Sequence, residues 1–296
     1  DLPLKLYELT RYSFRREQRG ELTGLRRLRA FTMPDCHALV ADLDQAISEF
    51  KIRNQLCFDV LKNVGISKED VELAVRVTKE FYENNKDIVL GLVKAIGKPA
   101  LIEMWDERTF YFILKYELNF VDGLDKASAL STDQIDVENG ERYDIRFTDK
   151  DGQRKHPLIL HCSPSGAIER NIYALLEKAA MQQKQGKVPS LPLWLSPTQV
   201  RIIPVTAEFN QFAGQFVEEI GGENIRVDID DRELHVGKKI REAEMEWCSY
   251  ILVVGEKEKN AKMLPIRVRG KKDLVEMPLN SLIAEIHEKT QGMPFK

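Results

Sequence analysis

The sequence has no long apolar run, few cysteines and little net charge. None of its 296 residues belongs to a stretch approaching the roughly 20 apolar residues that cross a bilayer, so we expect no membrane-spanning helix. The four cysteines form no C-x-x-C pair, which argues against a disulfide framework and favours a reducing compartment such as the cytoplasm. The formal net charge is −3, so any binding to nucleic acid would use local basic patches.

The composition is that of an ordinary globular protein. Hydrophobic residues make up 43% and charged residues 31%, and the length is enough for two domains. The chain opens on a strand-like segment without an initiator Met, so we expect it to be part of a longer protein.

The hydrophobic pattern predicts a first domain of mixed elements. Residues 1–40 alternate around a polar turn and predict a β-hairpin. Apolar residues at helical spacing predict helices throughout residues 40–98, with Ser67 and Asp70 as a capping box. Strands are then expected at 111–118, 134–137, 142–147 and 158–161, followed by a helix over 166–184.

A stretch with proline and glycine, residues 185–192, marks the predicted domain boundary. We place the first domain at 1–186, a linker at 187–197 and the second domain at 198–296. In the second domain, strands and helices alternate, which predicts a parallel or mixed sheet. The expected strands are 200–204, 225–229, 250–254 and 264–268, and the expected helices are 207–220, 236–245 and 279–289.

The predicted hairpin carries a spaced set of charged and aromatic residues. It reads Arg15-x-Glu17, a variable turn, then Arg27-x-x-x-Phe31-x-x-x-Asp35. Buried cations need anionic partners, so a nucleotide phosphate is the expected ligand, with Phe31 stacking on the base. A charged surface hairpin without a ligand is the alternative interpretation.

A second segment, H-C-S-P-S-G-A-I-E-R over residues 161–170, reads as a strand end, a turn of small residues and a helix start. Gly166 would let the backbone approach a ligand closely, and Arg170 lies in the first turn of the helix. His37 and His161 adjoin these two segments. Two histidines, a cysteine and an open position are typical of a Zn²⁺ site that takes a ligand, although a structural role for each histidine is the alternative.

These segments are similar to motifs 2 and 3 of class II aminoacyl-tRNA synthetases. F-T-M-P-D-C-H-A, H-C-S-P-S-G-A-I-E-R and V-G-K-K-I-R-E-A resemble the threonyl-tRNA synthetase family, and its archaeal branch most closely, and the resemblance covers essentially all 296 residues. It implies an α+β catalytic domain with an antiparallel sheet, an α/β anticodon-binding domain with a mixed sheet, and a cytoplasmic homodimer.

The resemblance also implies a role for individual residues. ATP, with Mg²⁺, would be bound by Arg15, Glu17, Arg27, Phe31, Gln134, Gly166 and Arg170, of which Arg15 and Arg170 would be catalytic. Threonine would contact Asp35, Lys115 and Gln134, and Zn²⁺ would be held by His37 and His161. The third zinc ligand of the family is a cysteine upstream of residue 1, which none of the four cysteines matches. Contacts to tRNA would come from Arg19, Arg241, Lys257, Glu258 and Arg267.

The activity that the resemblance implies is ATP-dependent formation of threonyl-adenylate and transfer of threonine to the 3′ end of tRNA(Thr). One alternative is another class II synthetase, such as a prolyl enzyme, which would lack the pair His37 and His161. A second alternative is an inactive synthetase-like protein that binds tRNA, in which the motif arginines would be expected to be lost.

Overall fold

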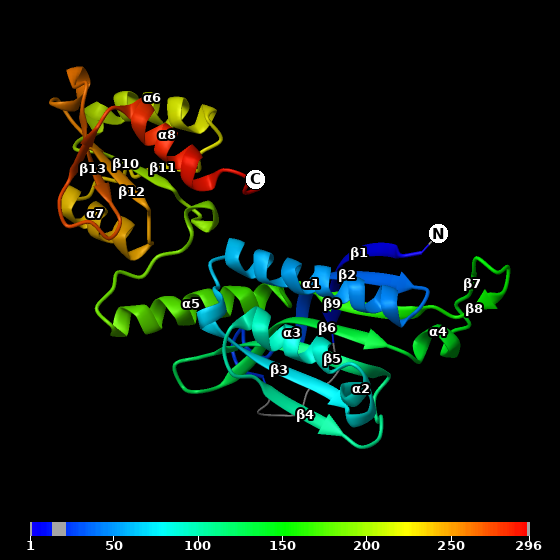
Figure 1. Cartoon of the computed structure of the whole chain (residues 1–296). Coiled ribbons are helices and arrows are strands. Elements are labelled where there is room, and N and C mark those ends of the chain that lie inside the picture. The colour runs from blue at the N-terminus through cyan, green and yellow to red at the C-terminus, as the bar shows by residue number, and fades with distance from the viewer. Residues whose placement is uncertain (1, 14–21, 295–296) are drawn as a thin grey trace. The chain divides into compact units, whose positions relative to one another are not determined.

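The structure is a computed structural model that describes residues 2–13 and 22–294. Two compact units, residues 1–178 and 179–296, make up the chain and are described in turn (Figure 1). All four cysteines are free thiols. No helix in the described ranges combines the length and the apolarity needed to cross a membrane.

The first unit is built on a seven-stranded sheet in the order β1-β2-β9-β6-β5-β3-β4. Neighbouring strands are antiparallel, except that β4 runs parallel to β3, so the predicted antiparallel sheet is confirmed. The predicted hairpin is confirmed as the pairing of β1 with β2. The strands are β1 (Leu4–Ser13), β2 (Ala30–Val40), β3 (Val71–Thr78), β4 (Leu101–Trp105), β5 (Phe112–Val121), β6 (Ala127–Asp136) and β9 (Leu158–Ser163). A separate ribbon joins β7 (Phe147–Thr148) and β8 (Arg154–Lys155).

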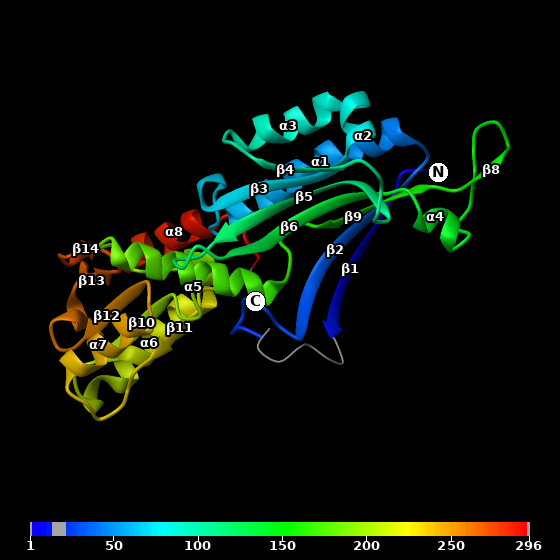
Figure 2. The ribbon, with the colours of Figure 1, turned by 90° about the horizontal axis from the view of Figure 1, so that it is seen from below.

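Three helices, α1, α2 and α3, lie on one side of this sheet (Figure 2). The longest, α1, begins after Asp42, whose carboxylate accepts the backbone N–H of Gln45 at 2.8 Å, and packs on β2, β9 and β6. We call the side of the sheet under α1 the helix face and the opposite side the site face. The helices are α1 (Leu43–Asn63), α2 (Lys79–Asn84), α3 (Lys86–Ile96), α4 (Asn139–Arg142) and α5 (Ile168–Lys184).

Two of the sequence predictions in this unit are wrong. Residues 71–78 form strand β3 and not a helix, because Val71, Leu73, Val75 and Val77 are buried at every second position, which is the period of a strand. Of residues 142–147, only Phe147 lies in a strand, the short β7. The carboxylate of Asp136 accepts the backbone N–H groups of Glu138 and Asn139, and the short helix α4 that follows ends at Arg142, where the strand was expected to begin.

The second unit has a five-stranded sheet in the order β11-β10-β12-β13-β14. The first three strands are parallel and the last two pairings are antiparallel, so the predicted mixed sheet is confirmed. Its elements are β10 (Val200–Pro204), α6 (Asn210–Gly222), β11 (Val227–Ile229), α7 (Val236–Met245), β12 (Tyr250–Val254), β13 (Leu264–Val268), β14 (Val275–Met277) and α8 (Leu279–Thr290). Four 3₁₀ turns complete the described chain, at Lys68–Asp70, Leu193–Leu195, Ala207–Phe209 and Glu258–Asn260.

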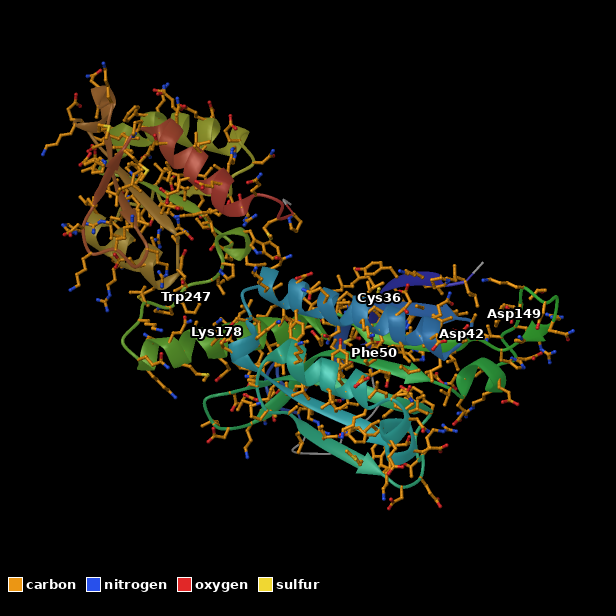
Figure 3. The ribbon with its side chains drawn as sticks, in the orientation of Figure 1. Cys36, Asp42, Phe50, Asp149, Lys178 and Trp247 are labelled. Carbon is orange, nitrogen blue, oxygen red and sulfur yellow. The ribbon has the colours of Figure 1, made fainter. Side chains whose placement is uncertain are left out.

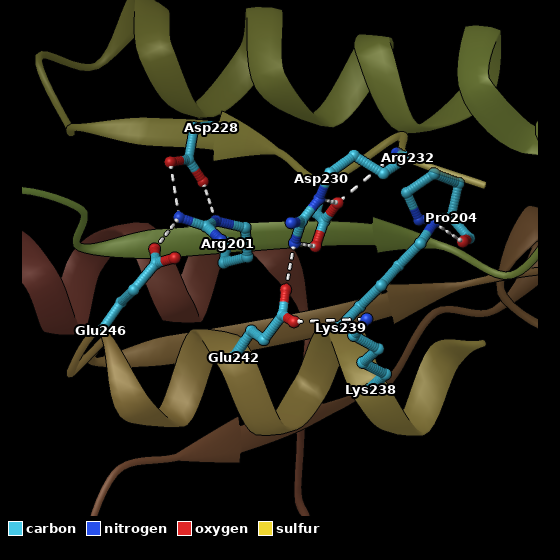
Figure 4. A network of polar contacts seen from close by, with 9 residues as sticks. All are labelled: Arg201, Pro204, Asp228, Asp230, Arg232, Lys238, Lys239, Glu242 and Glu246. Carbon is cyan, nitrogen blue, oxygen red and sulfur yellow. Dashed lines mark hydrogen bonds and ion pairs between the residues drawn. The ribbon is translucent and has the colours of Figure 1, made fainter. Parts of the chain in front are cut away.

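Ion pairs fasten α7 to the parallel part of this sheet (Figure 4). Arg201 on β10 bonds to Asp228 on β11 and, at 2.7 Å, to Glu246 at the end of α7. Arg232 forms a second bridge, to Asp230 and to Glu242 of α7, each at 2.7 Å. Both bridges place a positive group between two carboxylates, so each carboxylate that leaves water is compensated.

The turn between β9 and α5 depends on Gly166. Its φ is +69°, and a Cβ added there would lie 2.1 Å from the carbonyl oxygen of Leu130. Gly166→Ala should therefore lower the free energy of unfolding by about 3 kcal/mol or more, since backbone strain and a backbone clash add together. Gly97→Ala is the matched control, because Gly97 has φ +79° but open space around it, and should cost about 1 kcal/mol. Urea unfolding of the two variants measures the difference, and equal losses would contradict the clash.

Candidate functional site

Three strands bring the predicted site residues into one row. His37 on β2 pairs with His161 on β9, and His161 pairs with Gln134 on β6. The row continues to Lys115 on β5, opposite Gln134, and to Arg76 on β3. Directly opposed residues in a sheet point to the same side, so these side chains share the site face.

A cavity of about 310 Å³ opens on the site face over β2, β9 and β6. Among the described residues that line it, Asp35 is the one acid, with 8% of its surface exposed. The Asp35 carboxylate accepts hydrogen bonds from the hydroxyl of Ser163 and, at 3.1 Å, from the hydroxyl of Tyr12. The cavity is lined by Tyr12, Phe31, Met33, Asp35, His37, Thr132, Gln134, His161, Cys162 and Ser163.

The two histidines face one another through the same ring nitrogen. The Nδ1 atoms of His37 and His161 are 3.2 Å apart. Each Nε2 atom faces a carboxylate instead: His161 Nε2 lies 2.8 Å from Asp136 Oδ2, and His37 Nε2 lies 4.0 Å from Glu8 Oε2. Burial, together with the nearby His161, lowers the pKa of His37, so this ring is neutral at pH 7.

Asp136 determines which nitrogen of His161 carries the proton. Burial alone would raise the pKa of Asp136, but the bond from His161 and the backbone N–H groups of Asn139 and Glu138 hold it below its usual value. An ionised carboxylate can only accept, so Nε2 of His161 donates and Nδ1 presents its lone pair toward His37. At 3.2 Å, Nδ1 of the neutral His37 then donates to Nδ1 of His161. A metal ion could bind both Nδ1 atoms once His37 carries its proton on Nε2, which faces Glu8.

The site face fits part of a Zn²⁺ site. Two nitrogens that each bind a tetrahedral Zn²⁺ at about 2.0–2.1 Å are about 3.3 Å apart, close to the observed separation of the Nδ1 atoms. A carboxylate on the remote nitrogen is the usual companion of a metal-bound histidine. Within residues 2–13 and 22–294, however, no group of three or more His, Cys, Asp or Glu is placed to hold a metal, so the described residues supply two ligands only.

Of the other residues predicted for ATP and threonine, Phe31 and Gln134 line this cavity, and Arg170 and Lys115 are not among its lining residues. Phe31 lines it, and its ring centroid is 6.0 Å from that of Tyr12. Arg170 donates to the carbonyls of Ala129 at 2.7 Å and Arg26 at 3.1 Å, which joins α5 to the segment that leads into β2. Lys115 pairs with Glu117 at 2.8 Å.

Some predicted residues lie at a turn or outside the described residues. Arg27 is exposed in a turn closed by hydrogen bonds to Thr23 at 3.1 Å. Arg15, Glu17 and Arg19 fall outside the described residues.

The second unit has its own cavity, of about 520 Å³, and it gathers three of the predicted tRNA contacts. Lys257, Glu258 and Arg267 line it, and Glu258 accepts the backbone N–H of Gly255 at 2.9 Å. The cavity lies at the carboxyl ends of β10 and β12, where α/β sheets commonly bind ligands. Arg241, on α7, is exposed and is not among the lining residues.

Trp247 follows α7 with φ +62°, and its ring lies 5.6 Å from the guanidinium carbon of Arg269. This contact with Arg269 gives Trp247 a packing role within the second unit.

The sequence alone does not reveal that Tyr12 and Thr132 line the cavity, or that the hydroxyl of Ser163 donates to Asp35. Tyr12 stands opposite Phe31 in the pairing of β1 with β2, so an exact hairpin register would have found it. Ser163 and Thr132 depend on the pairing of β9 with β6, which no local pattern predicts.

Two family models match the chain. The model "tRNA synthetase class II core domain (G, H, P, S and T)" matches residues 1–179, and the model "Anticodon binding domain" matches residues 199–289. The chain is 58% identical over 295 residues to a threonine–tRNA ligase of Nitrosopumilus maritimus, covering 100% of this chain and 48% of the relative. It thus spans about half the length of the curated relatives it matches.

Solved structures show the same fold. The RNA binding domain of threonyl-tRNA synthetase from Cryptosporidium parvum matches with a TM-score of 0.78 at 23% identity, covering 99% of this chain and 72% of that one. A prolyl-tRNA synthetase of the same organism matches with a TM-score of 0.71 at 18% identity, covering 97% and 53%. Because both amino acid specificities occur on this fold, the fold alone does not select the amino acid.

The contact between Tyr12 and Asp35 gives a measurable titration. Burial, the hydrogen bond to Asp35 and the charge of Asp35 raise the pKa of Tyr12 to about 12. Asp35→Asn removes the charge, so the pKa of Tyr12 should fall by about one unit in NMR of labelled tyrosine. Tyr173, whose hydroxyl bonds to Asp122, is the internal control and should not move. An unchanged Tyr12 pKa would contradict the contact.

Proposed function

Because the chain belongs to the family of class II tRNA synthetase core domains, we propose that it is the catalytic and anticodon-binding part of a threonine–tRNA ligase. In the proposed reaction, the carboxylate of threonine attacks the α-phosphorus of ATP and releases pyrophosphate. The terminal ribose hydroxyl of tRNA(Thr) then attacks the carbonyl of the adenylate and releases AMP. The identity to threonine–tRNA ligases over the whole chain supports this proposal above a prolyl enzyme or an inactive protein.

The observation that carries the proposal is the placement of Asp35 beside the pair His37 and His161 in one small cavity. A carboxylate held by two hydroxyl groups is fixed in position and can accept the hydroxyl of a bound threonine. Valine has nearly the same shape but donates no hydrogen bond, so one acceptor position of that carboxylate would stay unfilled, which is costly in a buried site. Serine keeps the hydroxyl and loses one methyl group, so it is rejected only weakly.

The ATP side of the site is proposed from the motif residues. Arg15 and Arg170 would stabilise the charge that develops on the phosphates, and Mg²⁺ with ATP would share this task. Phe31, on the wall of the same cavity, would stack on adenine. Glu17 would accept a hydrogen bond from the amino group of the adenine. The remaining proposed contacts to ATP and threonine come from Arg27, Gly166, Gln134 and Lys115.

His37 and His161 would hold Zn²⁺ through their Nδ1 atoms. When bound, the ion would act as a Lewis acid that takes the amino and hydroxyl groups of threonine, which is what the resemblance implies. Asp136 keeps His161 in the tautomer that leaves Nδ1 without a proton. The third ligand is expected from a cysteine upstream of residue 1.

The cavity of the second unit would read the anticodon. Lys257 and Arg267 can donate to base edges and Glu258 can accept from them, and all three line one cavity. Arg241 and Arg19 are proposed as further tRNA contacts. Homodimer formation and a cytoplasmic location stay predictions of the resemblance.

Amino-acid-dependent ATP–pyrophosphate exchange tests the proposed function in the full-length protein. We expect exchange with threonine, with kcat/KM for valine lower by about 10⁴-fold and for serine by about 10- to 200-fold. Arg15→Ala should reduce exchange by about 10²- to 10³-fold, because charge at the α-phosphate loses its partner. Folded, zinc-loaded protein that shows no exchange with threonine, or that prefers proline, would contradict the assignment.

Asp136 gives a separate test of the zinc site. Asp136→Asn should weaken Zn²⁺ binding by about 10- to 100-fold in competition with a chromophoric chelator, because the carboxylate that orients His161 is lost. Glu8→Gln is the matched control: its carboxylate lies 4.0 Å from His37 and is exposed, so a smaller change is expected. Equal affinities for wild type and Asp136→Asn would refute the orienting role.

A further inference from the structure

A buried ion pair lies on the helix face, directly behind the cavity, and the proposed chemistry does not use it. Arg53 of α1 is 4% exposed, and Asp133 of β6 is completely buried. Arg53 Nε lies 3.2 Å from Asp133 Oδ2, and Arg53 Nη2 donates to the carbonyl oxygen of Cys36 on β2 at 2.6 Å. One guanidinium therefore joins α1 to two strands of the sheet.

The strand positions that Arg53 contacts alternate with cavity residues. Cys36 lies between Asp35 and His37, and Asp133 lies between Thr132 and Gln134. Between these strands runs β9, where Cys162 is the cross-strand partner of both Cys36 and Asp133. Since neighbouring residues of a strand point to opposite sides, fixing the backbone here from behind fixes the side chains in front.

The rest of the helix face supports the same strand positions. The Sγ atom of Cys162 lies 3.6 Å from that of Cys57 on α1, and the hydroxyl of Tyr116 on β5 donates to Cys57 at 3.3 Å. Phe50, labelled with Cys36 in Figure 3, packs edge-on against Tyr116 with ring centroids 5.3 Å apart. These contacts hold α1 against β5 and β9, and the ion pair holds it against β2 and β6.

Stability alone does not account for a buried ion pair. Well-packed apolar residues of similar volume are often as stable as such a pair, because two charges must leave water. Nε and Nη1 of Arg53 and Oδ2 of Asp133 are buried with no hydrogen-bond partner among the described residues, so charge alone holds the pair and the cost of burial rises. A planar guanidinium, however, holds its charge beside Asp133 while one nitrogen donates to the Cys36 carbonyl, in a fixed geometry that an apolar pair or a lysine cannot reproduce.

We propose that Arg53, acting through Cys36 and Asp133, is a positioning residue that sets the spacing of β2 and β6 and so the geometry of the threonine and zinc pocket. The proposal rests on the proposed function for the identity of the ligands. A displacement of about 1 Å at a reacting group can cost about 10²-fold in rate, so a loose sheet would reduce activity without unfolding the protein.

The test removes the ion pair and leaves no unpaired charge. In the full-length protein, Arg53→Met combined with Asp133→Leu should fold with a thermal midpoint close to that of wild type. The KM for threonine should rise by about tenfold or more and zinc affinity should fall by about tenfold, while the KM for ATP stays the same. Phe50→Leu is the matched control on the same face of α1 and should lower stability without changing the ratio of the two KM values.

Two readouts keep the outcomes distinct. Wild-type levels of threonine KM and zinc affinity in the folded double variant would overturn the positioning role. If the double variant fails to fold, Arg53→Lys takes its place, because it keeps the charge and loses the planar guanidinium. The same rise in the KM for threonine and the same fall in zinc affinity are then expected. If wild type itself shows no exchange with threonine, the proposed function fails, and zinc affinity alone decides on Arg53.

Discussion

The hydrogen-bonded register of β2, β9 and β6 is the constraint on which the site depends. It places His37 opposite His161 although the two residues are 124 positions apart in the chain. A slip of β9 by one residue would turn the His161 side chain to the helix face and the Cys162 side chain, which contacts Cys57 there, to the site face. Asp136 would then have no imidazole to orient, and Asp35 would lose the hydroxyl of Ser163.

The two faces of the sheet have different tasks. The site face is polar and partly open, and it carries groups that can meet a substrate or a metal ion. The helix face is closed by α1, and its apolar contacts and the ion pair of Arg53 with Asp133 fix the strands. Consecutive residues of a strand point to opposite faces of the sheet, so a shift of the backbone moves side chains on both faces together. The proposed specificity for threonine would therefore depend on packing behind the cavity as well as on residues within it.

Most of the fold and part of the site could be predicted from the sequence. The strands of the second unit at 200–204, 250–254 and 264–268 follow from the sequence because these apolar runs are too short for a helix and are rich in Val and Ile. Residues 71–78 were mistaken for a helix, since the alternation of β3 lies between two real helices. Arg53 and Asp133 could not be paired in advance, because each looks like an ordinary surface residue until α1 is laid on β6.

The coordination of His37 and His161 tests the central claim most directly. Crystals of the zinc-loaded full-length protein, measured on both sides of the zinc absorption edge, would locate the ion by its anomalous signal. The expected result is one peak about 2.0–2.1 Å from the Nδ1 atoms of both histidines, with Nε2 of His161 still bonded to Asp136. A peak bound through Nε2, or one that lies away from this pair, would contradict a site set by the register of the three strands.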